Sequence, residues 1–67
     1  MPYYCINQVK DEHGDNEVHT LDCAWKPEKR TDLGLHESCE SAVTLAKGIG
    51  FKSANGCIHC SKACHTS

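Results

Sequence analysis

The chain has 67 residues, a formal net charge of −2 and six cysteines. This length corresponds to one domain, 1–67, which buries only about 60% of the surface that its unfolded form exposes. Leu, Ile, Val and Phe supply eleven residues, about 16% of the chain, which is too few for a self-sufficient core. Domains this small usually need disulfides or a metal. The composition therefore predicts a small domain stabilised by one of these two means.

The N-terminal segment MPYYCINQVK shows no export signal, because no basic stretch precedes a long apolar run. No segment approaches the ~20 apolar residues of a membrane span. We therefore expect a cytoplasmic, reduced protein, in which clustered cysteines are metal ligands. The mild acidity argues against a dedicated nucleic-acid binder. Only Lys26, Lys29 and Arg30 cluster, and short charge clusters are usually solvated surface.

The first half of the chain predicts a hairpin. Residues 3–9 alternate in a period-two pattern with aromatic and β-branched side chains, which favours a strand. The polar segment DEHGDNE predicts a turn, and a second short strand should follow around Val18. Residues 26–32 contain Pro27 and no apolar side chain, so we expect a loop, followed by a third short strand over 33–36.

The second half of the chain predicts one helix over residues 38–48. Ser38 is a suitable N-cap, and Gly48 is well placed to end the helix. Apolar or small residues recur there with helical spacing: Cys39, Ala42, Val43 and Ala46. Asn55-Gly56 predicts a turn, and the tail is long enough for one further helical turn. The expected fold class is a small α+β domain with a two- or three-stranded antiparallel sheet.

Two short motifs carry candidate chemistry. Cys57-Ile-His-Cys60 can direct two thiolates at one ion, and His19-Thr-Leu-Asp-Cys23 can supply the two further ligands that tetrahedral zinc needs. In a straight strand His19 and Cys23 would lie ~13 Å apart, so the chain must bend between them. The sequence therefore predicts one Zn²⁺ per chain, bound by His19, Cys23, Cys57 and Cys60 in a C-terminal zinc knuckle.

Other ligand sets remain open at this point. Cys57, Cys60, Cys64 and His65 lie within nine residues, so a site could use the tail alone, or Cys64 could replace His19. Cys39 is expected to be a core thiol, because free cysteine behaves as a small hydrophobe. Cys5 receives no role.

These motifs resemble those of a known family. Roughly residues 18–60 resemble the N-terminal metal-binding domain of the Ada DNA-repair protein. The matching segments are His19 to Cys23, Ser41-Ala42-Val43 to Gly50-Phe51, and Cys57 to Cys60. The resemblance implies a zinc-stapled α+β scaffold. It does not imply methyl transfer, because His19 stands where that family has its methyl-accepting cysteine.

A second resemblance covers almost the whole chain. The chain is similar to a group of short, uncharacterised, cysteine-rich bacterial proteins. The shared features are Tyr near the start, Gly-Asp-x-Glu-Val-His over 14–19, Leu-Gly over 33–34 and the ending GCxxCxxxCHTS. This resemblance implies no activity.

Three classes of function follow from these patterns. The first is a non-enzymatic, monomeric zinc module that acts through a protein partner. The second is a weak nucleic-acid binder on an Ada-like scaffold, and the third is a thiol-based sensor that uses Cys60 or Cys64. Zinc hydrolysis is not expected, because a Cys3His set fills all four positions of the ion. A disulfide oxidoreductase is not expected either, because the only predicted helix precedes the C-x-x-C.

Overall fold

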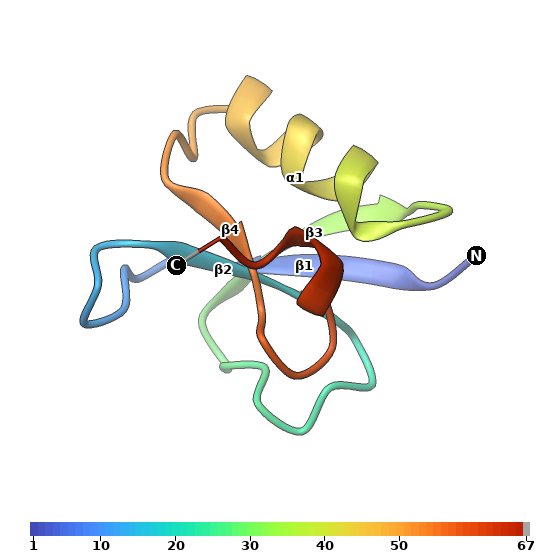
Figure 1. Cartoon of the computed structure of the whole chain (residues 1–67), viewed down its shortest axis with the longest axis horizontal. Coiled ribbons are helices and arrows are strands. Elements are labelled where there is room, and N and C mark those ends of the chain that lie inside the picture. Colours follow the sequence, from blue (N-terminus) through green and yellow to red (C-terminus); the bar gives the residue numbers. More distant parts are fainter. Residues whose placement is uncertain (67) are drawn as a thin grey trace.

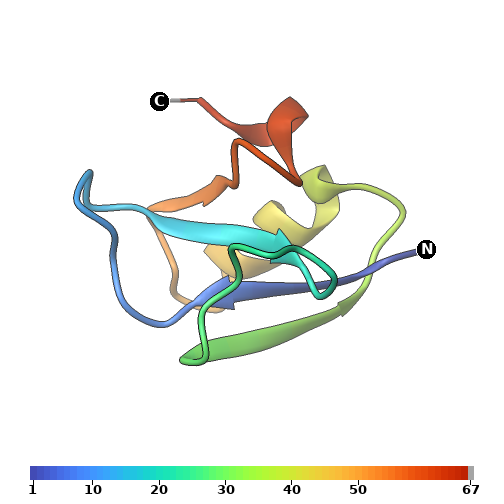
Figure 2. The same cartoon turned by 90° about the horizontal axis from the view of Figure 1, so that it is seen from below.

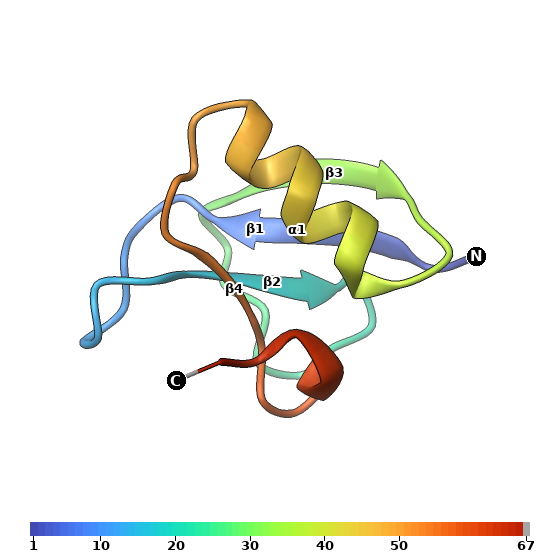
Figure 3. The ribbon, with the colours of Figure 1, turned by 45° about the horizontal axis from the view of Figure 1, so that its top comes forward.

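A computed structural model describes residues 1–66. In chain order it contains strands β1 (Tyr3–Asn7), β2 (Asn16–Thr20) and β3 (Arg30–Leu35), helix α1 (Cys39–Gly48), strand β4 (Ala54–Gly56) and a 3-10 turn, η1 (Lys62–Cys64). The strands form one sheet in the order β3-β1-β2-β4, and α1 lies across one face of this sheet (Figure 1, Figure 3). The predicted small α+β class is therefore confirmed.

The β1–β2 hairpin distributes its side chains between the two faces of the sheet. The strands are antiparallel, with Ile6 opposite Val18 and Cys5 opposite His19. Because side chains alternate along a strand, Ile6 and Val18 point to one face, where both join the apolar core with α1. Cys5 and His19 point to the other. We call these the helix face (Ile6, Val18) and the loop face (Cys5, His19), since the 21–29 loop covers the second (Figure 2).

The turn of the hairpin is built around one aspartate. Asp11 Oδ1 accepts hydrogen bonds from the backbone N–H groups of His13 and Asp15, both at 2.9 Å. Gly14 adopts a φ of 81°, a left-handed conformation that glycine enters without a Cβ clash. The predicted turn is thus confirmed, with Gly14 in it, and Asp11 supplies hydrogen bonds that the composition of the segment did not specify.

Strand β3 begins at Arg30, so the expected loop over 26–32 is too long. β3 pairs antiparallel with β1, from Arg30 opposite Asn7 to Leu35 opposite Tyr3. It lies at one edge of the sheet, where a strand needs backbone pairing on one side only and tolerates exposed polar side chains. The first residues of β3 are polar and lack the apolar alternation that predicts a strand, so the sequence pattern placed its start too late.

Helix α1 runs over Cys39–Gly48, as predicted to within one residue. Ser38 is the N-cap by position, although its side chain makes no capping hydrogen bond. Beyond the end of the helix Gly50 has a φ of 119°, and the Phe51 N–H donates to Ala46 O at 2.9 Å. This backbone reversal turns the chain from the helix toward β4.

The apolar core fills the space between α1 and the helix face. Within residues 1–66 it consists of eight buried residues: Tyr4, Ile6, Val18, Leu33, Cys39, Ala42, Ala46 and Ala54. Because three of them are alanines, helix and sheet pack closely but bury little apolar area. The core is as small as the composition predicts.

The expected turn at Asn55-Gly56 is wrong, because both residues lie in β4. This strand runs parallel to β2, with Val18 opposite Gly56, which adds a fourth and parallel strand to the predicted sheet. A Cβ on Gly56 would lie 2.5 Å from Ser61 O and 2.7 Å from Cys64 Cβ. Glycine is therefore needed here for the close passage of the tail, and its φ is not in the left-handed region.

The tail returns over β4 and ends next to α1. The predicted final helical turn is present as η1. Cys64 forms a disulfide with Cys39, with a Cα–Cα distance of 6.2 Å. Cys39 is buried in the core as expected, but the expectation of a free thiol is wrong. Among the described residues, no helix has the length and apolar character needed to cross a membrane.

Candidate metal centre

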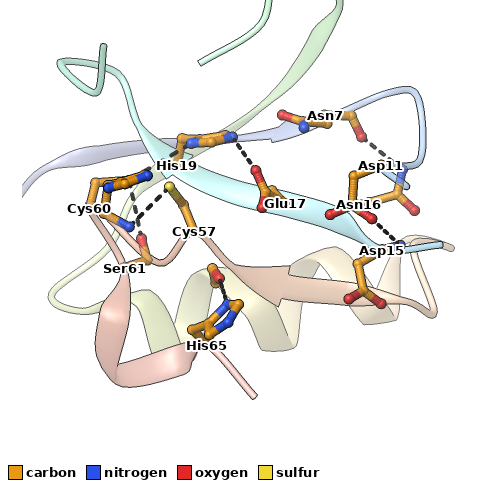
Figure 4. Close-up of polar contacts among 12 residues, drawn as sticks. Asn7, Asp11, Asp15, Asn16, Glu17, His19, Cys57, Cys60, Ser61 and His65 are labelled. Atoms are coloured by element: carbon orange, nitrogen blue, oxygen red, sulfur yellow. Dashed lines mark hydrogen bonds and ion pairs between the residues drawn. The ribbon is translucent and has the colours of Figure 1, made fainter. Parts of the chain in front are cut away.

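Four side chains converge at the end of the loop face. His19 comes from β2, Cys23 from the bend after β2, and Cys57 and Cys60 from the turn after β4. Their ligand atoms all lie within 4.8 Å of one another. The four residues that the two sequence motifs single out are thus brought together, and Figure 4 shows three of them, His19, Cys57 and Cys60, grouped next to β2.

Backbone pairing explains why the two motifs meet. The Cys57 N–H donates to Val18 O at 2.9 Å, which extends the β2–β4 pairing and places Cys57 next to His19. On the other side β2 ends at Thr20, and the Cys23 N–H donates to Thr20 O at 3.1 Å. This turn supplies the bend between His19 and Cys23 that the ligand spacing requires.

Backbone donors surround the sulfur atoms of the C-x-x-C. The Thr20 N–H donates to Cys60 Sγ at 3.4 Å, and the His59 N–H donates to Cys57 Sγ at 3.4 Å. These two hydrogen bonds hold the sulfur atoms in fixed positions on the inner side of the turn. The turn thus prepares both sulfurs for coordination.

His19 is fully buried, with 0% of its surface exposed. Its Nδ1 faces the site at 3.9 Å from Cys60 Sγ, and its Nε2 faces Glu17 Oε1 at 3.5 Å (Figure 4). Burial, together with the nearby His59, lowers the pKa of His19, so the imidazole is neutral and Nδ1 can offer a lone pair. Nε2 makes no hydrogen bond among the described residues, so the Glu17 carboxylate is a nearby group that could orient the ring once the contact tightens, as carboxylates do for histidine ligands in metal sites.

The cysteines differ in the cost of ionisation. Burial raises the pKa of the Cys23 thiol to about 11, although a backbone hydrogen bond from Trp25 acts in the opposite direction. Burial also raises the pKa of Cys60, but hydrogen bonds from the Thr20 N–H and from the Cys23 and Ser61 side chains outweigh it and bring the pKa below its usual value. Ionisation of Cys23 next to Cys60 in this buried space therefore calls for a cation that balances the charge.

The geometry fits a tetrahedral ion. Around zinc, with Zn–S bonds of ~2.3 Å, sulfur atoms lie ~3.8 Å apart, and the four ligand atoms here lie within 4.8 Å. A contraction of about an ångström or less therefore closes the site. Three sulfurs and one imidazole nitrogen suit soft and borderline metals, and they do not suit magnesium or calcium, which prefer oxygen.

The alternative ligands Cys64 and His65 lie outside this group. Cys64 is bonded to Cys39, and the His65 ring is within hydrogen-bond distance of Gly56 O, with Nδ1 at 3.0 Å (Figure 4). The convergence of side chains therefore favours His19 over both as the fourth ligand. Cys5 is also separate from the group: it is fully buried on the loop face, and burial raises the pKa of its thiol.

An aromatic stack next to the site was not foreseen. The Trp25 and His59 rings lie parallel, with centroids 4.8 Å apart and planes 15° apart. Trp25 is 66% exposed. The stack connects the 21–29 loop to the 57–60 turn, so it joins the two segments that supply the cysteines. No motif in the sequence indicates this pairing, because Trp25 and His59 are far apart in the chain.

No protein-family model, curated protein or solved structure matches this chain. The fold and the four converging side chains define a small α+β protein with a candidate metal centre, and its function is argued from this geometry.

Proposed function

We propose that His19, Cys23, Cys57 and Cys60 bind one structural Zn²⁺ and that the chain is a non-enzymatic zinc module. The observation that carries this proposal is the convergence of their ligand atoms within 4.8 Å. The module would act as a monomer in the cytoplasm through a protein partner. The Ada-like spacing of the two motifs supports the scaffold and not the methyl-transfer chemistry, since His19 cannot accept a methyl group as the thiolate of that family does.

The structural role rests on the ligand count and on the burial of the site. Catalytic zinc keeps three protein ligands and one open position for water or substrate, whereas this set fills all four. Three of the four ligands are buried, and Cys60 is half-buried. Binding energy in a site that is absent from the unfolded chain becomes folding energy, which a core of eight residues requires.

Metal content per chain tests the quartet directly. We expect one zinc in the wild type and almost none in Cys23→Ala or Cys57→Ala, because loss of one thiolate opens the site. Cys5→Ala is the matched control, since Cys5 is a buried free cysteine on the same face, and this variant should keep its zinc. A wild-type chain purified without metal, or full zinc in Cys57→Ala, would refute the proposal.

A second candidate function is weak binding of single-stranded nucleic acid, and the Trp25–His59 stack favours it. Exposed aromatic rings provide platforms on which bases stack, worth about 1–3 kcal/mol per base. Lys26, Lys29 and Arg30 follow Trp25 closely and offer phosphate contacts. The net charge of −2 keeps this function in second place.

Trp25 provides its own probe, because it is the only tryptophan in the chain. If the function is correct, a single-stranded oligonucleotide quenches its fluorescence at low salt, and affinity falls steeply with added salt as phosphate contacts are lost. Lys29→Ala should weaken this binding, whereas Lys47→Ala, on α1, should not. An unchanged spectrum at low salt removes this candidate.

A further inference from the structure

The chain combines two cysteine chemistries that normally belong to different compartments. Zinc–thiolate sites persist where thiols are kept reduced, and disulfides persist where they are oxidised. Here the disulfide Cys39–Cys64 lies in the same small domain as the proposed zinc quartet. Cys64 follows the quartet member Cys60 by four residues, so the two chemistries share one short segment of chain.

We propose that Cys39 and Cys64 are a reversible redox couple that controls how tightly the metal site is closed. The proposal rests on the proposed zinc site and concerns its regulation. In the oxidised form the disulfide fastens the tail, residues 61–66, to α1. In the reduced form only non-covalent contacts hold the tail, and the metal escapes more readily.

The packing of the tail explains how the disulfide reaches the site. The Ser61 N–H donates to Cys57 O at 2.9 Å, and the Cys64 N–H donates to Ser61 O at 2.9 Å. These two bonds connect the disulfide, turn by turn, to the backbone of a quartet cysteine. The tail also passes so close over Gly56 that a Cβ there would lie 2.7 Å from Cys64 Cβ, so the segment has little freedom while the disulfide is intact.

Further along the tail, hydrogen bonds connect His65 and Thr66 to β4. The Thr66 N–H donates to Asn55 Oδ1 at 3.0 Å, and the His65 ring lies within hydrogen-bond distance of Gly56 O. No residue of η1 is buried. Cys64 is the residue of η1 that packs against the apolar core, and it is held there by the covalent bond to α1, so loss of this bond frees the turn while the buried core residues keep their contacts.

The sulfur atoms of Cys39 and Cys64 differ in exposure, and this difference determines which of them an external thiol attacks. Cys64 is half-buried, whereas Cys39 is 7% exposed and is the first residue of α1. A small thiol such as glutathione therefore attacks Cys64 Sγ, and Cys39 leaves as a thiolate at the helix N-terminus, where the dipole favours negative charge. Glu40 in the same turn offsets part of this effect.

The reaction balances with glutathione as the partner. The first glutathione thiolate forms a mixed disulfide with Cys64 as the Cys39–Cys64 bond breaks, and a second releases Cys64. Two electrons pass from the two glutathione thiols to the protein, both protein sulfurs end as thiols after taking up protons, and glutathione disulfide forms. Oxidation by glutathione disulfide reverses every step.

The test compares zinc release from the two redox forms. The zinc-loaded chain is equilibrated in glutathione buffer that is either mostly reduced or mostly oxidised, and a chromogenic chelator then follows metal release. Peptide mapping of each form identifies the linked cysteines. We expect a Cys39–Cys64 cross-link in the oxidised form only, and release from the reduced form that is at least about tenfold faster, since loop closure by a disulfide typically constrains a chain by more than this factor.

Two variants separate the couple from other thiols. Cys39→Ser/Cys64→Ser should release zinc at the fast rate in both buffers, and Cys5→Ala should keep the full difference between them. Equal release rates from the two wild-type forms, or a cross-link between other cysteines, overturn the redox proposal while the zinc site stands. A chain that carries no zinc in either buffer overturns the proposed function and, with it, the coupling. The comparison of the two wild-type forms remains valid even if a variant fails to fold.

Discussion

On the helix face, α1 covers Ile6, Val18 and Leu33 and forms the apolar cluster with them. On the loop face, the 21–29 loop and the 57–60 turn lie on the side of the sheet opposite α1 (Figure 1), and neither segment contributes a residue to that cluster. One face is thus stabilised by apolar burial, and the other brings together polar, metal-ligating side chains. In a chain this short, neither source of stability is large enough alone.

Metal removal should produce the largest effect on this balance. With a strong chelator under reducing conditions, we expect the cooperative fold to be lost, because structural zinc contributes on the order of 10 kcal/mol to small domains. The amide NMR spectrum before and after chelation checks this. An unchanged spectrum after verified metal removal would contradict the prediction, and a spectrum in which only loop-face signals change would show that the two faces fold independently.

Truncation in the apolar core should have the next largest effect. Ile6 is fully buried, so Ile6→Ala should lower the free energy of unfolding of the zinc-loaded chain by about 2–5 kcal/mol. Denaturant unfolding measures this change. Val9→Ala is the control, since Val9 is 63% exposed and its loss should cost no more than about 0.5 kcal/mol. Similar costs at both positions would mean that the helix face contributes little.

Gly56→Ala tests the contact between the tail and β4. The new Cβ would lie 2.5 Å from Ser61 O, so we expect a loss of about 1–3 kcal/mol through overpacking. Gly48→Ala, at the end of α1, meets no atom within 4 Å and should be neutral or stabilise by up to about 1 kcal/mol. Thermal unfolding of both variants provides the comparison. If Gly56→Ala and Gly48→Ala have equal melting temperatures, the tail does not pack tightly against Gly56.

The smallest expected effect concerns Glu17, which faces His19 Nε2 at 3.5 Å. Glu17→Gln removes the negative charge next to the imidazole and should weaken zinc binding about tenfold, the low end of what outer-shell changes cost in other metal sites, because Nε2 makes no hydrogen bond to this carboxylate. Competition with a chelator of known affinity measures this. Glu12→Gln, whose side chain is 89% exposed, should leave affinity unchanged, and an equal loss in both variants would exclude a specific role for Glu17.

Features with a local cause were predictable from the sequence. The helix over Cys39–Gly48 follows from residue spacing, the hairpin turn from the polar segment that contains Gly14, and the candidate quartet from two motifs whose residues are close in sequence. Even the bend between His19 and Cys23 follows, because an extended chain cannot bring both to one ion. Each inference needs only a few neighbouring residues and the geometry of the backbone.

Features that depend on distant partners were decided by the tertiary structure. Asn55-Gly56 has the sequence of a turn, but β2 offers it a strand position and the returning tail requires a residue without a Cβ. Cys39 and Cys64 are 25 residues apart, and they become partners only because the tail folds back onto α1. The sequence by itself determined which side chains can bind a metal. Packing determined which cysteines remain for a disulfide, because that choice depends on distances in space.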